Sequence, residues 1–175
     1  MGRQTERGHP GSPPFDLAEP NAAALRFMLG HYATGVAVLT GIVDGVPCGM
    51  AVNSFTSVSL DPPLVLFCPS LASTTWPLLR RSEVVAVNLL SRQQQALGSV
   101  FSGKGRDRFE SVLWRRGPAG APLLDGALAW LECKVAAEHL GGDHTIVVGE
   151  VLRLGVHAES GARPLVFFRG DYFDA

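Results

Sequence analysis

The chain has 175 residues, of which 46% are hydrophobic and 18% charged, a size and composition typical of one folded domain. Its 15 Lys and Arg nearly balance its 16 Asp and Glu, and aromatic residues make up only 8%. This balance argues against binding to nucleic acid or to an anionic membrane through bulk charge, and the scarce aromatics disfavour a base-stacking surface. We therefore predict neither a nucleic-acid partner nor a membrane partner.

The apolar runs and the cysteines indicate the cellular compartment. No apolar run reaches the length of a membrane-spanning helix, and the N-terminus lacks the apolar segment typical of a secretory signal. Cys48, Cys68 and Cys133 are far apart and odd in number, and each lies in an apolar segment. We expect buried, reduced thiols in a cytoplasmic protein. Close Cys and His pairs are missing, so we expect no metal.

The N-terminal residues 1–20 are rich in Gly, Pro, Arg and Glu and are predicted to form a mobile tail, followed by a single domain over 21–175. Asn21 can cap a helix that begins the domain. Apolar residues share one face of this predicted helix: Leu25, Met28, Leu29 and Tyr32.

Six or seven strands and two or three short helices are predicted. The runs 35–43 and 46–52 flank Asp44-Gly45, which is typical of a hairpin turn because that turn needs positive φ. Further strands are expected at 64–68, 84–88, 127–140, 145–156 and 164–173, short helices at 73–81 and 92–101, a loop over 101–126 and a hairpin connection over 138–145. Alternation of strands with helices is missing, as is G-x-G-x-x-G, so a small antiparallel barrel with peripheral helices is favoured.

A hydroxyl-rich segment, NSFTSVSLDPP, covers residues 53–63. Pro62 and Pro63 lack backbone donors, so the segment cannot be a central strand throughout. In an extended backbone Asn53, Phe55, Ser57 and Ser59 would face one side, and Ser54, Thr56 and Val58 the other. The segment is either a polar rim that binds a flat heteroaromatic ligand or a solvated sheet edge, and composition alone slightly favours the edge.

The segment 101–116 carries a local charge of +3, from five Lys and Arg against two acids. Such an excess could attract a phosphate, although charge alone favours a solvated loop. Near the predicted second hairpin, Asp143 stands beside His144 in GGDHT and could orient the ring. His144 is therefore either a site residue or a plain turn residue. Neither a G-x-S-x-G motif nor an activated cysteine indicates nucleophilic catalysis.

The order of six segments resembles the flavin reductase domain family, the small reductase components of two-component flavin-dependent monooxygenases. These segments are ATGVAVLTG, GMAVNSFTSVSLDPPLVLFC, FSGKGRDRFE, GAPLLDGALAWLECKV, GDHTIVVGEV and PLVFFRGDY, and the resemblance covers about residues 26–172. It implies a mainly β, Greek-key-like split barrel with a few short peripheral helices. It also implies a homodimer that holds FMN or FAD near the subunit interface. Hydride would pass from NADH or NADPH to the flavin, which a partner monooxygenase would receive in reduced form.

The resemblance also implies roles for individual residues. His144 would be the catalytic residue and would position the nicotinamide without acting as an obligatory base. The hydroxyl-rich segment would line the flavin ring with Asn53, Ser54, Phe55, Thr56, Ser59 and Leu60. The flavin tail would meet Thr34, Val36 and Val38, and its phosphate Ser73, Thr74, Thr75 and Lys104 or Arg108. The set of cofactor-binding residues is completed by Phe101, Asp143 and Tyr172.

One departure from the family concerns Trp76-Pro77, where relatives often have His-Pro, so a role of that histidine is lost or passes to the indole. An alternative is an FMN-binding protein or an FMN-dependent oxidase of the same barrel architecture, without nicotinamide turnover. No basic cluster for a pyridoxal phosphate is evident, and GDHT argues for a nicotinamide.

Overall fold

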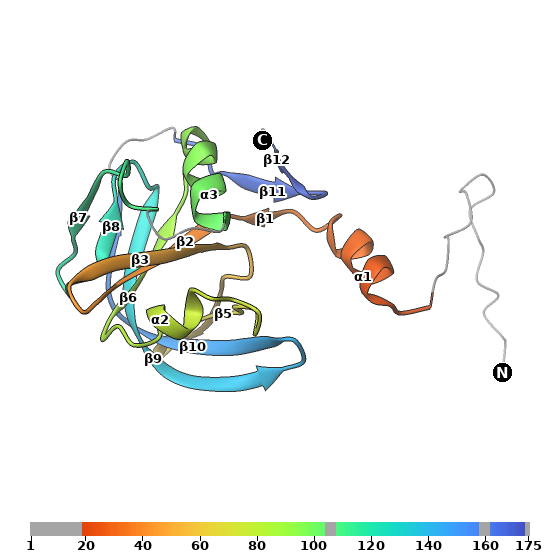
Figure 1. Ribbon diagram of the computed structural model, residues 1–175, viewed down its shortest axis with the longest axis horizontal. Helices are drawn as coiled ribbons and strands as arrows, with labels where there is room; N and C mark the ends of the chain where they lie inside the picture. The colour runs from red at the N-terminus through yellow and green to blue at the C-terminus, as the bar shows by residue number, and fades with distance from the viewer. Residues whose placement is uncertain (1–18, 104–107, 158–161, 174–175) are drawn as a thin grey trace, which may run out of the picture.

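The computed structural model describes residues 19–103, 108–157 and 162–173. Its largest sheet has seven antiparallel strands in the order β3-β2-β6-β9-β10-β5-β4, which curve around the core (Figure 1). Their bounds are β2 Ala37–Val43, β3 Val46–Val52, β4 Thr56–Leu60, β5 Pro63–Phe67, β6 Val85–Leu89, β9 Ala129–Gly141 and β10 His144–Val156.

Two smaller sheets and three helices complete the described structure. The three-stranded sheet contains β1 Thr34–Gly35, β11 Val166–Phe168 and β12 Asp171–Phe173, and the two-stranded sheet contains β7 Trp114–Arg116 and β8 Pro122–Leu124. The helices are α1 Ala22–Leu29, α2 Trp76–Leu79 and α3 Gln95–Ser102, the last preceded by the 3-10 turn η1 Arg92–Gln94.

The prediction of a mainly β fold with a few short helices is confirmed. The order of the large sheet begins with β3 and ends with β4, and these two strands are not paired with each other among the described residues. The strand pairing that the structure describes therefore does not close the sheet into a barrel.

The core lies within the curved sheet and is built from aliphatic side chains of its central strands. Leu39, Phe67, Val87 and Val147 are completely buried in one cluster. Full burial of such a side chain stabilises the fold by about 1.5–3 kcal/mol. This energy favours the strand register in which these apolar side chains point into the core. Trp76 at the start of α2 packs edge-on against Phe67, with ring centroids 5.4 Å apart.

Two local predictions are confirmed by backbone geometry. Asp44 and Gly45 have φ of 53° and 80°, and they join β2 to β3 in a hairpin as expected. The second predicted hairpin joins β9 to β10, whose pairing runs up to Gly141 and His144, so its turn is shorter than predicted.

Two other predictions were partly wrong. The helix expected over 73–81 is only the single turn of α2, because the Ser73 hydroxyl accepts hydrogen bonds from the backbone N–H groups of Thr75 and Trp76 and holds the preceding residues in a turn. The expected loop over 101–126 contains the hairpin of β7 and β8. The connection of that hairpin, residues 117–121, contains Gly117, Pro118 and Gly120.

The hydroxyl-rich segment supplies the edge strand β4, in agreement with the expectation that its prolines keep it from the centre of a sheet. The strand begins only at Thr56, and its register against β5 shifts between Ser57 and Ser59. This irregularity breaks the regular two-sided alternation that was predicted for residues 53–59.

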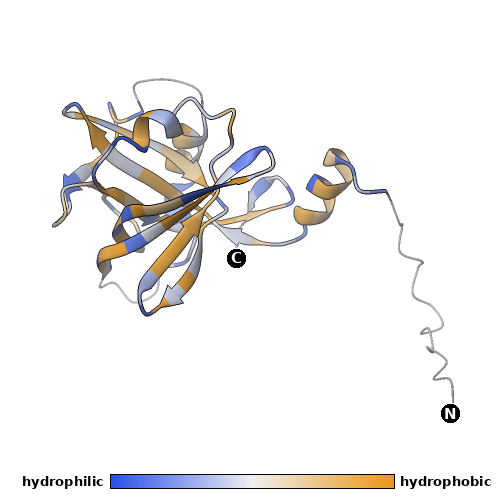
Figure 2. Cartoon of the chain, turned by 90° about the horizontal axis from the view of Figure 1, so that it is seen from below, coloured by the Kyte–Doolittle hydropathy of each residue, from blue (hydrophilic) through white to orange (hydrophobic). Residues whose placement is uncertain are grey.

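Helix α1 stands away from the sheets (Figures 1 and 2). Asn21 caps it as predicted, because its Oδ1 accepts hydrogen bonds from Ala23 N and Ala24 N at 3.0 Å. At the other end, Gly30 O accepts from Arg169 N at 2.8 Å, which holds the helix to the turn between β11 and β12. No residue of α1 is buried. The exposed large apolar residues of α1 and the turn after it are Leu25, Phe27, Met28, Leu29 and Tyr32.

None of the described helices is both long enough and apolar enough to cross a membrane. Residues 1–18 of the predicted mobile tail lie outside the described residues.

Candidate active site

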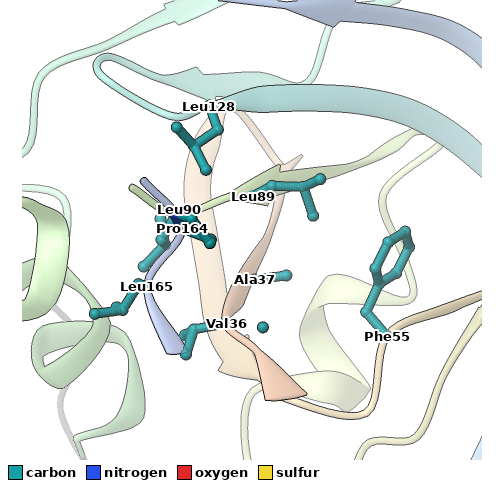
Figure 3. A pocket seen from close by; sticks show the side chains of 9 residues that line it. Val36, Ala37, Phe55, Leu89, Leu90, Leu128, Pro164 and Leu165 are labelled. Carbon is teal, nitrogen blue, oxygen red and sulfur yellow. The ribbon is translucent and has the colours of Figure 1, made fainter. Parts of the chain in front are cut away.

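An apolar pocket of about 270 Å³ opens between the start of β2, the end of β6 and the beginning of the hydroxyl-rich segment (Figure 3). It brings together Val36 and Phe55, two residues from segments that were predicted to share a ligand. Only glycine and apolar residues line it: Gly35, Val36, Ala37, Phe55, Leu89, Leu90, Leu128, Pro164 and Leu165. Such a surface suits the flat apolar part of a ligand.

Next to this pocket in the chain, Thr34 carries a hydroxyl that is buried and has no hydrogen-bond partner in the structure. Buried polar atoms are nearly always paired, so an orphaned hydroxyl beside a pocket indicates a partner that the protein does not supply. Thr34 was predicted to bind a cofactor, and its position at the start of β1 fits that prediction.

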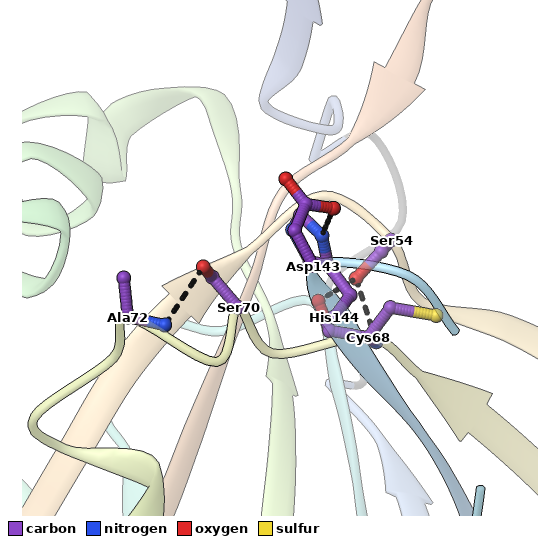
Figure 4. Close-up of polar contacts among 6 residues, drawn as sticks. All are labelled: Ser54, Cys68, Ser70, Ala72, Asp143 and His144. Atoms are coloured by element: carbon purple, nitrogen blue, oxygen red, sulfur yellow. Dashed lines mark hydrogen bonds and ion pairs between the residues drawn. The ribbon is translucent and has the colours of Figure 1, made fainter. Parts of the chain in front are cut away.

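The beginning of the hydroxyl-rich segment is fixed by Ser54. Its Oγ accepts a hydrogen bond from Cys68 N at 2.9 Å and donates to Cys68 O at 3.4 Å (Figure 4). These bonds join residues 53–55 to the end of β5, opposite the point where β4 begins. Ser54 therefore sets the path of the segment, and Phe55 follows into the pocket.

His144 is held near the same end of β5. It forms an isolated antiparallel bridge with Ser70, and Thr145 N donates to Pro69 O at 2.9 Å. Because Ser70 is two residues after Cys68, the backbone that binds Ser54 also binds the start of β10. The structure thus brings the hydroxyl-rich segment and His144 to one end of the sheet (Figure 4).

Asp143 orients the ring of His144, with Asp143 Oδ1 2.7 Å from His144 Nδ1. This hydrogen bond, followed by the charge of the imidazole, lowers the pKa of the Asp143 carboxyl below its usual value. An ionised carboxylate only accepts hydrogen bonds, so Nδ1 carries the proton and Nε2 is left for another partner. The His144 side chain is 44% exposed, which makes that nitrogen available to a ligand.

A cationic group stands beside β3, the strand that leads into Asn53. Arg108 donates through Nη1 to Gly49 O at 2.6 Å and to Thr75 Oγ1 at 3.0 Å, and through Nη2 to Gly103 O. Its Nε is buried without a partner, and burial lowers the pKa of the guanidinium. Ser73 lies close by, since its hydroxyl donates to Met50 Sδ at 3.8 Å.

Three predicted site residues pack in the core or against it. Val38 is 0% and Phe101 1% exposed, and both belong to one buried cluster. Phe101 lies against Gly49, where a Cβ atom would come within 2.9 Å of the ring. Tyr172 packs on the same cluster and on Phe167, with ring centroids 5.9 Å apart. Val38 and Phe101 thus pack inside the core and Tyr172 packs against it, and the roles of these three residues toward a flavin stay predictions.

The remaining predicted residues divide by exposure. Thr74 is exposed, and on the edge strand Thr56 and Leu60 are exposed while Ser59 is half-buried. Lys104 lies outside the described residues. Trp76 is buried against Phe67, so the indole that stands in place of the family's histidine belongs to the core.

The thiols and possible metal ligands add no further chemistry. Burial raises the pKa of all three cysteines, that of Cys133 to about 12, so thiolate nucleophiles are disfavoured at neutral pH. Cys133 is buried as expected, whereas Cys48 and Cys68 are half-buried, and all three are free. Among residues 19–103, 108–157 and 162–173, no group of three or more His, Cys, Asp or Glu is placed to hold a metal ion.

Sequence reasoning missed part of the site. The pocket residues Leu89, Leu90, Leu128, Pro164 and Leu165 were not predicted, and neither was Cys68, the partner of Ser54. They are ordinary apolar strand and loop residues, so nothing in their local sequence marks them.

Comparison with known proteins decides the family. A family model described as "Flavin reductase like domain" matches residues 29–175. The chain belongs to the flavin reductase-like domain family. This confirms the resemblance that the six ordered segments indicated.

Relatives of this flavin reductase-like chain are similar over most of its length. It is 43% identical over 147 residues to the reductase subunit HsaB of a flavin-dependent monooxygenase from Rhodococcus jostii (strain RHA1), covering 84% of this chain and 74% of that protein. It is 43% identical over 152 residues to the FMN reductase (NADH) SmoA from Agrobacterium fabrum, covering 87% and 85%.

Solved structures share the fold. The NADH:FAD oxidoreductase SgcE6 from Streptomyces globisporus, in complex with NAD and FAD fragments, matches with a TM-score of 0.84 at 36% identity. The match covers 91% of this chain and 96% of that one.

Proposed function

We propose that this protein is an NADH-dependent flavin reductase that reduces FMN or FAD and supplies the reduced flavin to a monooxygenase. The observation that carries the proposal is the apolar pocket that includes Phe55, at the end of the sheet that also holds Ser54 and His144. The unpaired hydroxyl of Thr34, which precedes the pocket residue Gly35 in the chain, adds a candidate hydrogen-bonding group. The proposal is supported by family membership and by relatives named FMN reductase (NADH) and NADH-dependent FAD reductase.

The residues present fit a flavin. Its ring system has an apolar benzenoid side and a polar side, and the pocket offers an apolar surface that includes Val36 and Phe55. Thr34 Oγ1 would gain the hydrogen bond that it lacks. Residues 53–59 would face the polar side of the ring and supply backbone N–H groups, which stabilise negative charge on it.

The flavin phosphate fits the group formed by Arg108, Thr75 and Ser73. A guanidinium binds phosphate through several parallel hydrogen bonds, and two hydroxyls stand within the same cluster. The cluster lies beside Gly49 and Met50 of β3, a few residues before the hydroxyl-rich segment. A flavin whose ring lies against the hydroxyl-rich segment could therefore place its phosphate, at the other end of the molecule, at this cluster.

His144 would position the nicotinamide. When NADH and the flavin are bound together, hydride would pass from the nicotinamide ring to the flavin ring. The protein needs to hold the two rings in contact and keep water away, and Nε2 of His144 can bind the carboxamide or a phosphate of NADH. Asp143 keeps the imidazole oriented for this task.

A homodimer is the second part of the proposal. Helix α1 leaves its large apolar residues more than half exposed, and the bond between Gly30 O and Arg169 N fixes the end of the helix to the turn between β11 and β12. Because the helix is tethered in this way, a second copy of the chain is the occupant that we propose for its apolar face, and two-fold symmetry would cover both helices at once. A cytoplasmic location is supported by the three free cysteines.

The reaction itself is the first test. Purified protein mixed with FMN and NADH without oxygen is expected to bleach the visible absorption of the flavin in many turnovers, measured against NADH and FMN alone. A protein that binds flavin tightly but does not bleach it with NADH would contradict the proposal and favour the alternative of a flavin carrier or an oxidase.

His144→Ala is expected to raise the KM for NADH about 2- to 10-fold, the loss of one net hydrogen bond, with the flavin Kd unchanged. Steady-state kinetics gives the KM, and titration of flavin fluorescence gives the Kd. His139→Ala, an exposed histidine of β9, is the matched control and should change neither. Equal losses for NADH and flavin in His144→Ala would count against the assignment.

Arg108→Gln is expected to raise the Kd for FMN about 10- to 100-fold, because a charge-assisted hydrogen bond to the phosphate is lost. Riboflavin lacks the phosphate, so its Kd should change little. Arg115→Gln removes the same charge from an exposed position of β7 and serves as the control. Unchanged discrimination between FMN and riboflavin in Arg108→Gln would show that the phosphate binds elsewhere.

Leu25→Glu combined with Leu29→Glu is expected to convert a dimer into a monomer, because two carboxylates would have to be buried in the interface. Light scattering during gel filtration measures the mass. Leu113→Glu changes an exposed leucine outside α1, on the surface before β7, and should leave the dimer intact. A wild-type protein that is monomeric at micromolar concentration would refute the homodimer.

A further inference from the structure

Polar side chains lie completely buried on three adjacent strands of the large sheet. Thr40 of β2, Asn88 of β6 and Glu132 of β9 are each 0% exposed. Thr40 and Glu132 both stand opposite Ala86 in register, and Asn88 stands opposite Val38 and Trp130 in a neighbouring row. Burial of a polar group costs free energy unless its hydrogen bonds are made. The hydrogen-bond partners of these three side chains therefore identify the part of the protein that they hold in place.

All three side chains bind the hairpin of β7 and β8. Asn88 Oδ1 accepts from Leu124 N at 2.8 Å, at the open end of the hairpin. Pro122 O, at the other end of β8, accepts from the hydroxyl of Thr40 and from Asn88 Nδ2 at 3.5 Å. Asn88 Nδ2 donates to Thr40 Oγ1 at 3.0 Å, which links the two residues.

Glu132 holds the other end of the hairpin. Its carboxylate oxygens accept from Ala119 N at 2.8 Å and Ala121 N at 2.9 Å, in the connection between β7 and β8. Glu132 thus holds only the connection, whereas Asn88 spans β8 and is the one of the two that reaches Leu124 N at the open end.

The open end of the hairpin leads to Arg108 through aromatic rings. Leu124, the residue bound by Asn88, pairs with Trp114 of β7. Trp114 packs edge-on against Phe109, with centroids 6.0 Å apart, and Phe109 packs in the same way against Phe101 at 5.2 Å. Phe109 directly follows Arg108 in the chain, so these rings define where the Arg108 backbone lies.

We propose that Asn88 is a positioning residue for the flavin phosphate: it holds β8 and Trp114, and through Phe109 it places Arg108 beside Thr75. This inference rests on the proposed function, since it takes Arg108 as the phosphate-binding group. Asn88 acts through the hairpin and touches no ligand. Glu132 holds the distant end, so it stabilises the hairpin without selecting the position of Arg108.

The test compares flavins with and without the phosphate in binding titrations, which do not depend on turnover. Asn88→Leu removes the bond to Leu124 N together with the bonds of Asn88 Nδ2 to Val38, Thr40 and Pro122. Trp114→Leu breaks the ring contact with Phe109 and leaves all of these bonds in place. Both variants are expected to raise the Kd for FMN at least about 5-fold, with the Kd for riboflavin changed by less than about 2-fold, because only the charged contact is displaced. Glu132→Gln should lower the melting temperature and leave the ratio of the two Kd values unchanged.

Three outcomes would overturn the inference. Equal loss of FMN and riboflavin binding in Asn88→Leu would indicate a general structural role. Unchanged FMN affinity in folded Trp114→Leu would remove the proposed path, and this variant decides the question alone should Asn88→Leu fail to fold. If Glu132→Gln shifts the ratio of the FMN Kd to the riboflavin Kd as much as Asn88→Leu does, the position of Arg108 depends on the whole hairpin and not on Asn88 in particular.

The Arg108→Gln variant separates this inference from the proposed function. If Arg108→Gln changes the ratio of the FMN Kd to the riboflavin Kd, whereas Asn88→Leu and Trp114→Leu leave it unchanged, the inference about Asn88 is overturned and the phosphate role of Arg108 stands. An unchanged ratio in Arg108→Gln overturns the phosphate role of Arg108 and the inference with it, whereas the bleaching of flavin by NADH tests the reaction independently.

Discussion

The candidate site depends on the pairing of β10 with two partners at once. On one side β10 pairs with β9 along nearly its whole length, and on the other side Val147 and Val148 pair with Phe67 and Leu66 of β5. Because side chains alternate along a strand, a slip of one residue would move Val147 out of the core and turn His144 to the opposite face. The burial of Val147 therefore fixes the direction of His144.

The same pairing explains how distant segments meet. The end of β5 continues into Cys68, Pro69 and Ser70, and these backbone groups bind Ser54 on one side and the start of β10 on the other. The hydroxyl of Ser54 and the register of β10 against β5 thus bring the hydroxyl-rich segment close to the imidazole of His144. The pocket with Phe55 opens beside this junction, where the start of β2 and the end of β6 contribute its apolar wall.

The chemistry of the site agrees with a protein that holds ligands and transfers no proton of its own. Burial raises the pKa of the cysteine thiols, and the Asp143 carboxylate, whose pKa is lowered, serves the orientation of His144. Hydride transfer between two bound rings needs contact and the exclusion of water. A curved sheet with a tightly packed interior provides fixed walls for such contact, and three of its buried polar residues, Thr40, Asn88 and Glu132, attach the hairpin of β7 and β8.

Features that depend on a few neighbouring residues could be predicted from the amino-acid sequence. Asn21 could be recognised as a cap, Asp44-Gly45 as a turn, and the segment that ends at Pro62-Pro63 as one that is not a central strand throughout, because each follows from local backbone geometry and missing donors. The ordered segments also identified the family. Only the tertiary structure decided which residues line the pocket, that Val38 and Phe101 turn inward, and that Arg108 reaches Gly49 and Thr75. These outcomes depend on the order in which strands far apart in the chain pair with one another, and local sequence does not encode that order.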